Sequence, residues 1–104
     1  MYLFSRQAQL ELGDLRGAMA WAIDQTEQVN RLCELDVTLS TQVFSPGLGT
    51  ITWSTTAESL ADLAAANDVL MTSDEYVAGF DAGAQFLHAP PDDAVMELIH
   101  LPDD

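Results

Sequence analysis

The sequence contains a single cysteine, Cys33, which excludes an intramolecular disulfide and any zinc site built on several cysteines. Cys33 falls where a helix is expected to end, and we interpret it as a small buried apolar residue. The two histidines, His88 and His100, lack the close spacing of a protein-built metal site. Phosphate-loop, dinucleotide and Gly-x-Ser-x-Gly fingerprints are also absent. The sequence therefore predicts neither a metal nor a cofactor.

Positive charge is equally scarce, because three arginines and no lysine accompany 17 acidic residues and the net charge is −14. A chain this acidic repels phosphate backbones and anionic lipid, which makes nucleic acid and membrane surfaces poor partners. The acidic residues form no long run. The charge therefore favours solubility, or an acidic host proteome, over a basic protein partner.

Long apolar segments are missing as well. No apolar run approaches the roughly 18 residues that cross a bilayer, and residues 1–9 lack the basic and apolar segments of a signal peptide. With 48% hydrophobic and 19% charged residues, the composition is that of a folded globular protein. The length of 104 residues fits one domain over 1–104. We expect a soluble, cytoplasmic, single-domain protein.

Four segments have the patterns of β-strands. An extended segment covers 2–10, and alternating residues over 36–44 and 50–54 flank the turn signal 45–49, which is typical of a hairpin. The last segment, 94–101, is nearly all apolar. We expect it to be a strand that is buried on both faces, or on one face and at a subunit interface.

A helix is predicted over 14–34, with Asp14 as its N-cap. Its apolar positions recur every three or four residues and define one buried face. That face comprises Leu15, Met19, Ala22, Ile23, Thr26, Val29 and Cys33. Gln25 and Gln28 fall mostly on the opposite side. Trp21 lies about a quarter-turn from the face, where it either widens the face or meets another subunit.

A second helical region follows the hairpin. Thr55 and Glu58 have the spacing of a capping box, which predicts a helix start there. The helical pattern pauses near residue 72, so two helices with a break are expected. Pro90 and Pro91 cannot continue a helix and mark the end of the second one.

The predicted order is strand, helix, strand, strand, helix, strand. Right-handed crossovers turn this βαββαβ order into an α+β, ferredoxin-like fold with a four-stranded antiparallel sheet and its helices on one face. Within one chain, the last segment should pair with the opening segment near Leu3. The other face of the sheet also requires a cover. The apolar last segment indicates that a second copy of the chain supplies it, so a homodimer is expected.

Residues 51–54 (Ile-Thr-Trp-Ser) lead into a helix, and over 68–76 a helix breaks before Glu75 and Tyr76. In this pattern, which extends over nearly the whole chain, the sequence resembles the dimeric α/β-barrel superfamily. That superfamily includes the antibiotic-biosynthesis monooxygenases, the NIPSNAP-like proteins and the stress-responsive barrel proteins. The resemblance implies a dimeric α/β barrel with a small apolar ligand between sheet and helices. It implies a lining of Phe4, Met19, Ile23, Trp53, Tyr76 and Phe80.

Two functions are consistent with these residues. The first is a cofactor-independent, monooxygenase-like enzyme or a binder of a small apolar ligand, with His100 or Tyr76 handling protons. It predicts a cavity of at least about 300 Å³ beside Trp53. The alternative is a non-catalytic homodimeric accessory or interaction module. In that case the same aromatic side chains fill the core, and the interface buries at least about 1,000 Å².

Overall fold

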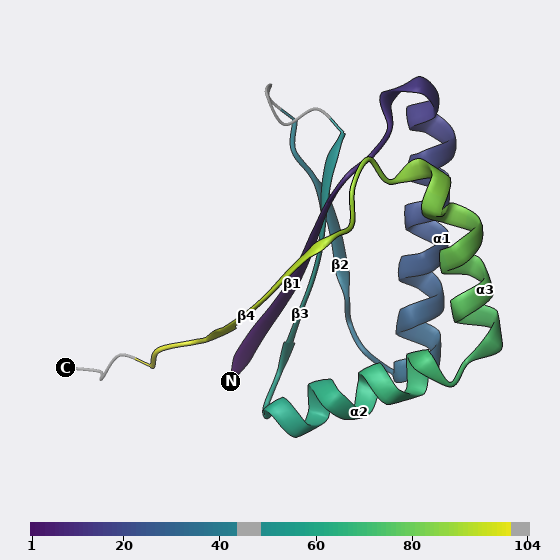
Figure 1. Cartoon of the computed structure of the whole chain (residues 1–104). Coiled ribbons are helices and arrows are strands. Elements are labelled where there is room, and N and C mark those ends of the chain that lie inside the picture. The colour runs from purple at the N-terminus through teal and green to yellow at the C-terminus, as the bar shows by residue number, and fades with distance from the viewer. Residues whose placement is uncertain (44–48, 101–104) are drawn as a thin grey trace.

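The computed structural model describes residues 1–43 and 49–100, and its elements follow the predicted βαββαβ order (Figure 1). The strands are β1 (Tyr2–Gln9), β2 (Thr38–Thr41), β3 (Thr50–Ala57) and β4 (Asp92–Glu97). The helices are α1 (Leu15–Cys33), α2 (Leu60–Met71) and α3 (Asp74–Gly83), with the short 3₁₀ turns η1 (Leu12–Asp14) and η2 (Ala84–Phe86). The predicted break near residue 72 is confirmed, because α2 and α3 are separate helices.

The four strands form an antiparallel sheet in the order β2-β3-β1-β4. β1 lies inside the sheet, where Leu3 is paired with Thr56 of β3 and with Met96 of β4. α1 and α3 lie side by side over one face, α2 crosses the end of the same layer, and the other face is uncovered (Figure 1). The predicted α+β, ferredoxin-like fold is confirmed, and so is the pairing of the last segment with the opening one.

The helix ends show why the breaks fall where they do. Asp14 caps α1, because its carboxylate accepts a hydrogen bond of 3.0 Å from the Gly17 N–H, and Glu34 ends the helix in the left-handed region at φ 53°. This confirms the helix predicted over 14–34. Ser73 caps α3 by accepting from the Tyr76 N–H at 3.2 Å. Across the described residues, every helix is too short or too polar to cross a bilayer.

The helix start predicted at Thr55 is wrong. Thr55 is a buried residue of β3 and is paired with Phe4, and the strand continues to Ala57. Ser59 caps α2 instead, by accepting from the Asp62 N–H at 3.1 Å. The reason is that β1 continues alongside β3 over this stretch, so the hydrogen bonds between the strands hold the backbone extended beyond the local helix signal.

The hairpin between β2 and β3 is confirmed. The two strands are paired from Thr38 opposite Ser54 to Thr41 opposite Ile51. Most of the predicted turn falls on 44–48, which lie outside the described residues. Gly49 has a φ of +85°, a backbone conformation that glycine adopts without the penalty that other residues incur.

The space between the sheet and the helices is filled at one end. The fully packed cluster there consists of Ala8, Leu10, Ala18, Ala22 and Ile51. Three of these five residues are alanines, of which Ala8 belongs to β1 and Ala18 and Ala22 to the first half of α1. Farther along, the sheet presents Phe4 and Arg6 to the second half of α1, and this part of the layer holds a cavity.

The uncovered face of the sheet is lined mostly by small, uncharged side chains. The strand register and the alternation of side chains place Thr38, Ser54, Ser5 and Ala94 in one row across it. Met96 lies beside this row and is 50% exposed. For a chain with 17 acidic residues, this is an unusually uncharged surface.

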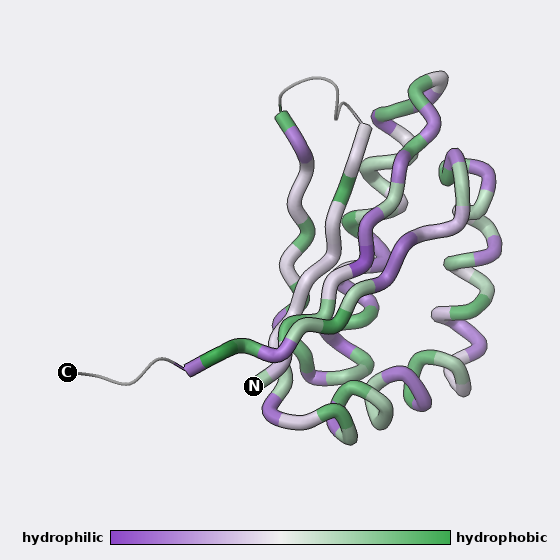
Figure 2. Tube along the Cα trace, turned by 60° about the vertical axis from the view of Figure 1, so that its left-hand side comes forward, coloured by the Kyte–Doolittle hydropathy of each residue, from purple (hydrophilic) through white to green (hydrophobic). Residues whose placement is uncertain are grey.

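β4 begins earlier than the predicted 94–101 and ends at Glu97, and residue 101 of the prediction lies outside the described residues. All six residues of β4 are exposed in a single chain. A single chain therefore does not bury this strand as expected. The Leu98 N–H donates to the Met1 carbonyl at 2.9 Å, after which the backbone leaves the sheet (Figure 1). The stretch that leads away is apolar (Figure 2), and its Ile99 is 77% exposed.

Candidate functional site

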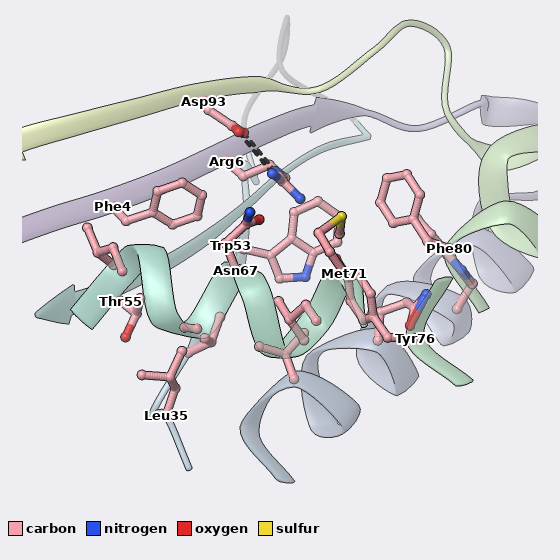
Figure 3. Close-up of a pocket in the computed structure, with 17 residues that line it drawn as sticks. Phe4, Arg6, Leu35, Trp53, Thr55, Asn67, Met71, Tyr76, Phe80 and Asp93 are labelled. Carbon is pink, nitrogen blue, oxygen red and sulfur yellow. Dashed lines mark hydrogen bonds and ion pairs between the residues drawn. The ribbon is translucent and has the colours of Figure 1, made fainter. Parts of the chain in front are cut away.

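A cavity of about 240 Å³ lies between the sheet and the helices, beside Trp53 (Figure 3). Its walls are mainly aromatic and aliphatic. The lining residues are Phe4, Arg6, Trp21, Gln25, Val29, Leu35, Val37, Trp53, Thr55, Leu63, Ala66, Asn67, Leu70, Met71, Tyr76, Phe80 and Asp93. An adjoining hollow of about 360 Å³ shares five of these residues and continues past Val77, Asp81 and Pro91. The first cavity is smaller than the predicted 300 Å³, whereas the two together exceed it.

Four of the predicted site residues meet at this cavity. Phe4 from β1, Trp53 from β3, and Tyr76 and Phe80 from α3 all line it (Figure 3). They come from three elements that are far apart in the sequence. The predicted aromatic lining is therefore brought together by the fold.

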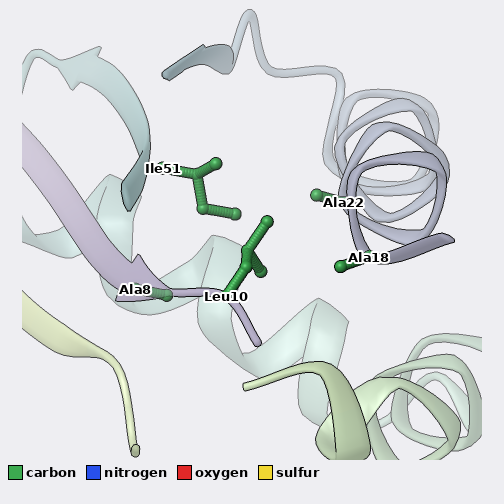
Figure 4. Close-up of a cluster of buried hydrophobic side chains, with 5 residues drawn as sticks. All are labelled: Ala8, Leu10, Ala18, Ala22 and Ile51. Atoms are coloured by element: carbon green, nitrogen blue, oxygen red, sulfur yellow. The ribbon is translucent and has the colours of Figure 1, made fainter. Parts of the chain in front are cut away.

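The structure places the other three predicted residues elsewhere. Met19 packs against the filled cluster drawn in Figure 4, and Ile23 is 46% exposed. The side of α1 that lines the cavity carries Trp21 and Gln25, so the helix is rotated relative to the expected face. His100 is exposed and lies beyond β4, away from both parts of the cavity.

The two tryptophans form the base of the cavity, and both indole N–H groups have partners. Trp53 Nε1 donates to Thr26 Oγ1 at 2.8 Å, and Trp21 Nε1 donates to the Gly79 carbonyl at 2.9 Å. The rings meet edge to face, with centroids 6.3 Å apart. With their polar atoms satisfied, these rings offer only apolar surface to a ligand. Trp21 thus widens the buried face of α1, which was one of the two expectations for it.

Tyr76 is the most deeply buried polar group at the cavity, at 5% exposure. Its ring stacks on Phe80, with centroids 6.2 Å apart. Burial raises the pKa of the Tyr76 phenol, and the positive charge of Arg6 opposes this shift. The phenol is therefore protonated at neutral pH and cannot serve as a base there.

Arg6 and Asp93 form the one charged pair of the lining. Nε and Nη2 of Arg6 donate to the two carboxylate oxygens of Asp93 at 2.7 and 2.9 Å. The hydrogen bonds to Asp93 raise the pKa of Arg6, against the effect of burial. The pair cancels its own charge within the cavity. The position of Arg6 in the lining could have been predicted from the sequence, because Arg6 follows Phe4 by two residues on one strand and therefore lies on the same face.

Gln25 was expected on the solvent side of α1, and that expectation is wrong. Its side chain lines the cavity and is 6% exposed. The amide lies against Gly79, where an added Cβ would come within 3.1 Å of Nε2. Nε2 has no hydrogen-bond partner among the described residues. Gln25 follows Ala18 by seven residues and Ala22 by three. This spacing puts the three residues on one side of the helix and could have predicted that Gln25 is buried.

Cys33 lies at the far end of α1 and is half-buried. Its thiol donates to the Ala66 carbonyl at 3.6 Å, and burial raises the pKa of the thiol. A raised pKa disfavours the thiolate, which agrees with an apolar role for Cys33, but the residue is half-buried and not buried as expected. In the part of the chain that the structure describes, no three histidine, cysteine, aspartate or glutamate side chains come together as a metal site would require.

The sheet order, the one-sided helices and the cavity between the layers define an α+β, ferredoxin-like protein. Solved structures with the same arrangement include a NIPSNAP domain protein from Burkholderia xenovorans, which has a TM-score of 0.81 and 11% identity over the whole of both chains. A NIPSNAP family protein from Agrobacterium tumefaciens has a TM-score of 0.77 and 12% identity, over 99% of this chain and 93% of that one. An antibiotic biosynthesis monooxygenase has a TM-score of 0.71 and 11% identity, over 96% and 100%.

These similarities confirm the resemblance inferred from the sequence at the level of the fold. Identities of this size do not transfer an activity. Comparison with models of protein families found no match, and comparison with curated protein sequences found none either.

Proposed function

We propose that this protein binds a small, largely apolar molecule in the cavity over Trp53, and that it does so as a homodimer. The observation that carries the proposal is the contrast between the two ends of one layer. Around Ala18 and Ala22 the space is filled by apolar side chains such as Leu10 and Ile51, whereas farther along the same layer aromatic side chains surround a cavity. A mainly apolar hollow with a few polar groups is typical of a small-molecule site.

Binding is favoured over catalysis because the described lining of the cavity beside Trp53 offers no free base. Among the described lining residues of the cavity beside Trp53, the only carboxylate is that of Asp93, and Arg6 is bound to it through two hydrogen bonds. Tyr76 is protonated at neutral pH. His100, the other expected proton-handling residue, is exposed beyond β4. A monooxygenase-like reaction would require a proton acceptor from another source.

The homodimer is supported by the uncovered face of the sheet. The row of Thr38, Ser54, Ser5 and Ala94 has short, uncharged side chains, which allow a second sheet to approach to the usual separation of about 10 Å. A second copy is the occupant we propose, because β4 and the apolar Met96 are exposed in one chain. Covering this face would complete a barrel of two sheets with the helices outside.

The test of the ligand site uses naphthalene, a neutral hydrocarbon of two fused rings. We expect it to shift the indole N–H resonances of Trp21 and Trp53 in the NMR spectrum of isotope-labelled protein, with saturation. Ala66→Phe adds a ring inside the cavity, because Ala66 lines it, and should abolish the shifts.

The matched control is Ala65→Phe. Ala65 is the preceding residue of α2, is exposed and does not line the cavity. This variant should bind naphthalene as the unaltered protein does. Absence of saturable indole shifts in the unaltered protein, or equal binding by both variants, would show that the cavity is not a ligand site.

A further inference from the structure

One polar group in the cavity lacks a partner within the protein. Gln25 is 94% buried, lines the cavity, and its Nε2 has no hydrogen-bond partner among the described residues. Leaving a buried donor unpaired costs about 1–3 kcal/mol. The two half-buried indole N–H groups of the lining differ in this respect, since both are bound to protein oxygens. The unpaired amide therefore marks the point at which a ligand atom would be recognised.

The chemistry of that ligand atom follows from the donor. An amide N–H requires an acceptor oxygen or nitrogen, which an ammonium group lacks. An anionic acceptor is disfavoured, because the cation of the lining, Arg6, is already neutralised by Asp93. The adjoining hollow adds the carboxylate of Asp81, and the whole chain carries a net charge of −14. A second negative charge inside the cavity would have no counter-ion.

We propose that the ligand is a neutral, largely apolar molecule with a carbonyl-type oxygen, and that Gln25 Nε2 donates a hydrogen bond to this oxygen. Gln25 thereby determines specificity within the site. This inference rests on the proposed function, because it requires that the cavity take up a ligand at all. It adds the charge class of the ligand and the atom by which the ligand is selected.

Three probes with one ring system separate the possibilities. Acetonaphthone is neutral and has a carbonyl oxygen, naphthalene has no acceptor, and naphthoate carries a negative charge. We expect the unaltered protein to bind acetonaphthone about fivefold more tightly than naphthalene, which is the effect of one net hydrogen bond. Naphthoate should bind more weakly than naphthalene, since its charge stays unpaired. Dissociation constants are measured from the indole N–H shifts of Trp21 and Trp53.

Gln25→Met keeps the length of the side chain and removes the donor, so acetonaphthone and naphthalene should then bind equally well. This variant is expected to fold, because it eliminates an unpaired buried group. Gln85→Met is the matched control. Gln85 belongs to η2, is exposed and lines neither part of the cavity. It should leave the preference for acetonaphthone intact.

The outcomes separate this inference from the proposed function. If naphthalene binds but acetonaphthone has no advantage, or naphthoate binds as tightly as acetonaphthone, the inference is wrong and the ligand site stands. The same holds if the advantage of acetonaphthone survives in Gln25→Met or is lost in Gln85→Met. If none of the three probes shifts the indole resonances, both the inference and the proposed ligand site are wrong.

Discussion

The indole N–H of Trp53 donates a hydrogen bond to the hydroxyl of Thr26 across 2.8 Å, and that hydroxyl donates in turn to the Ala22 carbonyl at 2.7 Å. This chain of two bonds joins the third strand of the sheet to the first helix. It lies where the filled core gives way to the cavity. The position of the Trp53 ring, and hence the shape of the base of the cavity, depends on it.

Thr26→Val tests this link. Valine keeps the shape of threonine, but it leaves the Trp53 N–H without a partner in a largely buried place. We expect the free energy of unfolding, measured by urea denaturation, to fall by about 1–3 kcal/mol. Thr26→Ser retains the hydroxyl and should lose less. A loss in the valine variant no greater than that in the serine variant would mean that the hydrogen bond contributes nothing to stability.

Gly83 allows the close approach of the Trp21 indole to α3. A methyl group at Gly83 would overlap the ring of Trp21, so Gly83→Ala must displace the ring. The expected cost is about 1–3 kcal/mol in the free energy of unfolding. At Gly13 an added Cβ meets no atom within 4 Å, and Gly13→Ala should therefore change stability by less than about 0.5 kcal/mol. Equal effects at the two positions would contradict the packing described for Trp21.

The strands, the helices and the sheet order could be predicted from the sequence because they depend on local patterns. The alternation around Phe4 and Trp53 places both on the buried face of their strands, whatever packs against them. Local patterns did not predict which side of α1 faces the sheet. An alanine-rich helix face has a weak apolar signal, so the predicted face includes Ile23 and omits Ala18, whereas Ala18 is fully buried beside Ala22 and Ile23 is exposed.

Two other errors have a common cause, which is the presence or absence of a neighbouring strand. Thr55 has a local helix-cap signal, but pairing with Phe4 keeps it in the sheet. His100 was placed on a strand by its alternation with Leu98. The pairing of β4 with β1 ends at Glu97 opposite Tyr2, so the side on which His100 lies is not set by the sheet. Neither effect is visible in a short stretch of sequence.

The uncovered face of the sheet should be the site of dimerisation. Ser54→Glu places a carboxylate in the middle of the row of short side chains, where two copies would face each other. We expect sedimentation equilibrium to show a dimer for the unaltered protein at micromolar concentration and a monomer for this variant. Ala20→Glu adds the same charge to an exposed position of α1 and should remain dimeric. A monomeric unaltered protein, or a dimeric Ser54→Glu variant, would contradict the proposed interface.

Gln25→Met should make the ligand-free protein more stable. The substitution removes a buried donor that has no partner, and the expected gain is about 1 kcal/mol in the free energy of unfolding. Gln85→Met removes an exposed amide, and we expect no gain from it. Urea denaturation in the absence of any probe measures both. A loss of stability in Gln25→Met would mean that the amide has a structural partner in solution.

Tyr76 should make stability depend on alkaline pH. Burial raises the pKa of its phenol in the native state, whereas an exposed tyrosine in the unfolded chain loses its proton at a pKa of about 10. The native state therefore holds a proton that the unfolded state releases. The contribution of Tyr76 is complete below that pH, and it is lost as the pH rises toward the native pKa.

Tyr76→Phe removes this dependence, and urea denaturation at a series of pH values between about 9 and 11 measures it. The thiol of Cys33 also has a raised pKa and would contribute with the same sign, so all variants are compared in a Cys33→Ala background. Tyr2→Phe is the matched control and should retain the alkaline loss. If Tyr76→Phe and Tyr2→Phe lose stability with pH to the same extent, the phenol of Tyr76 is not held in the protonated form by its place between the sheet and α3.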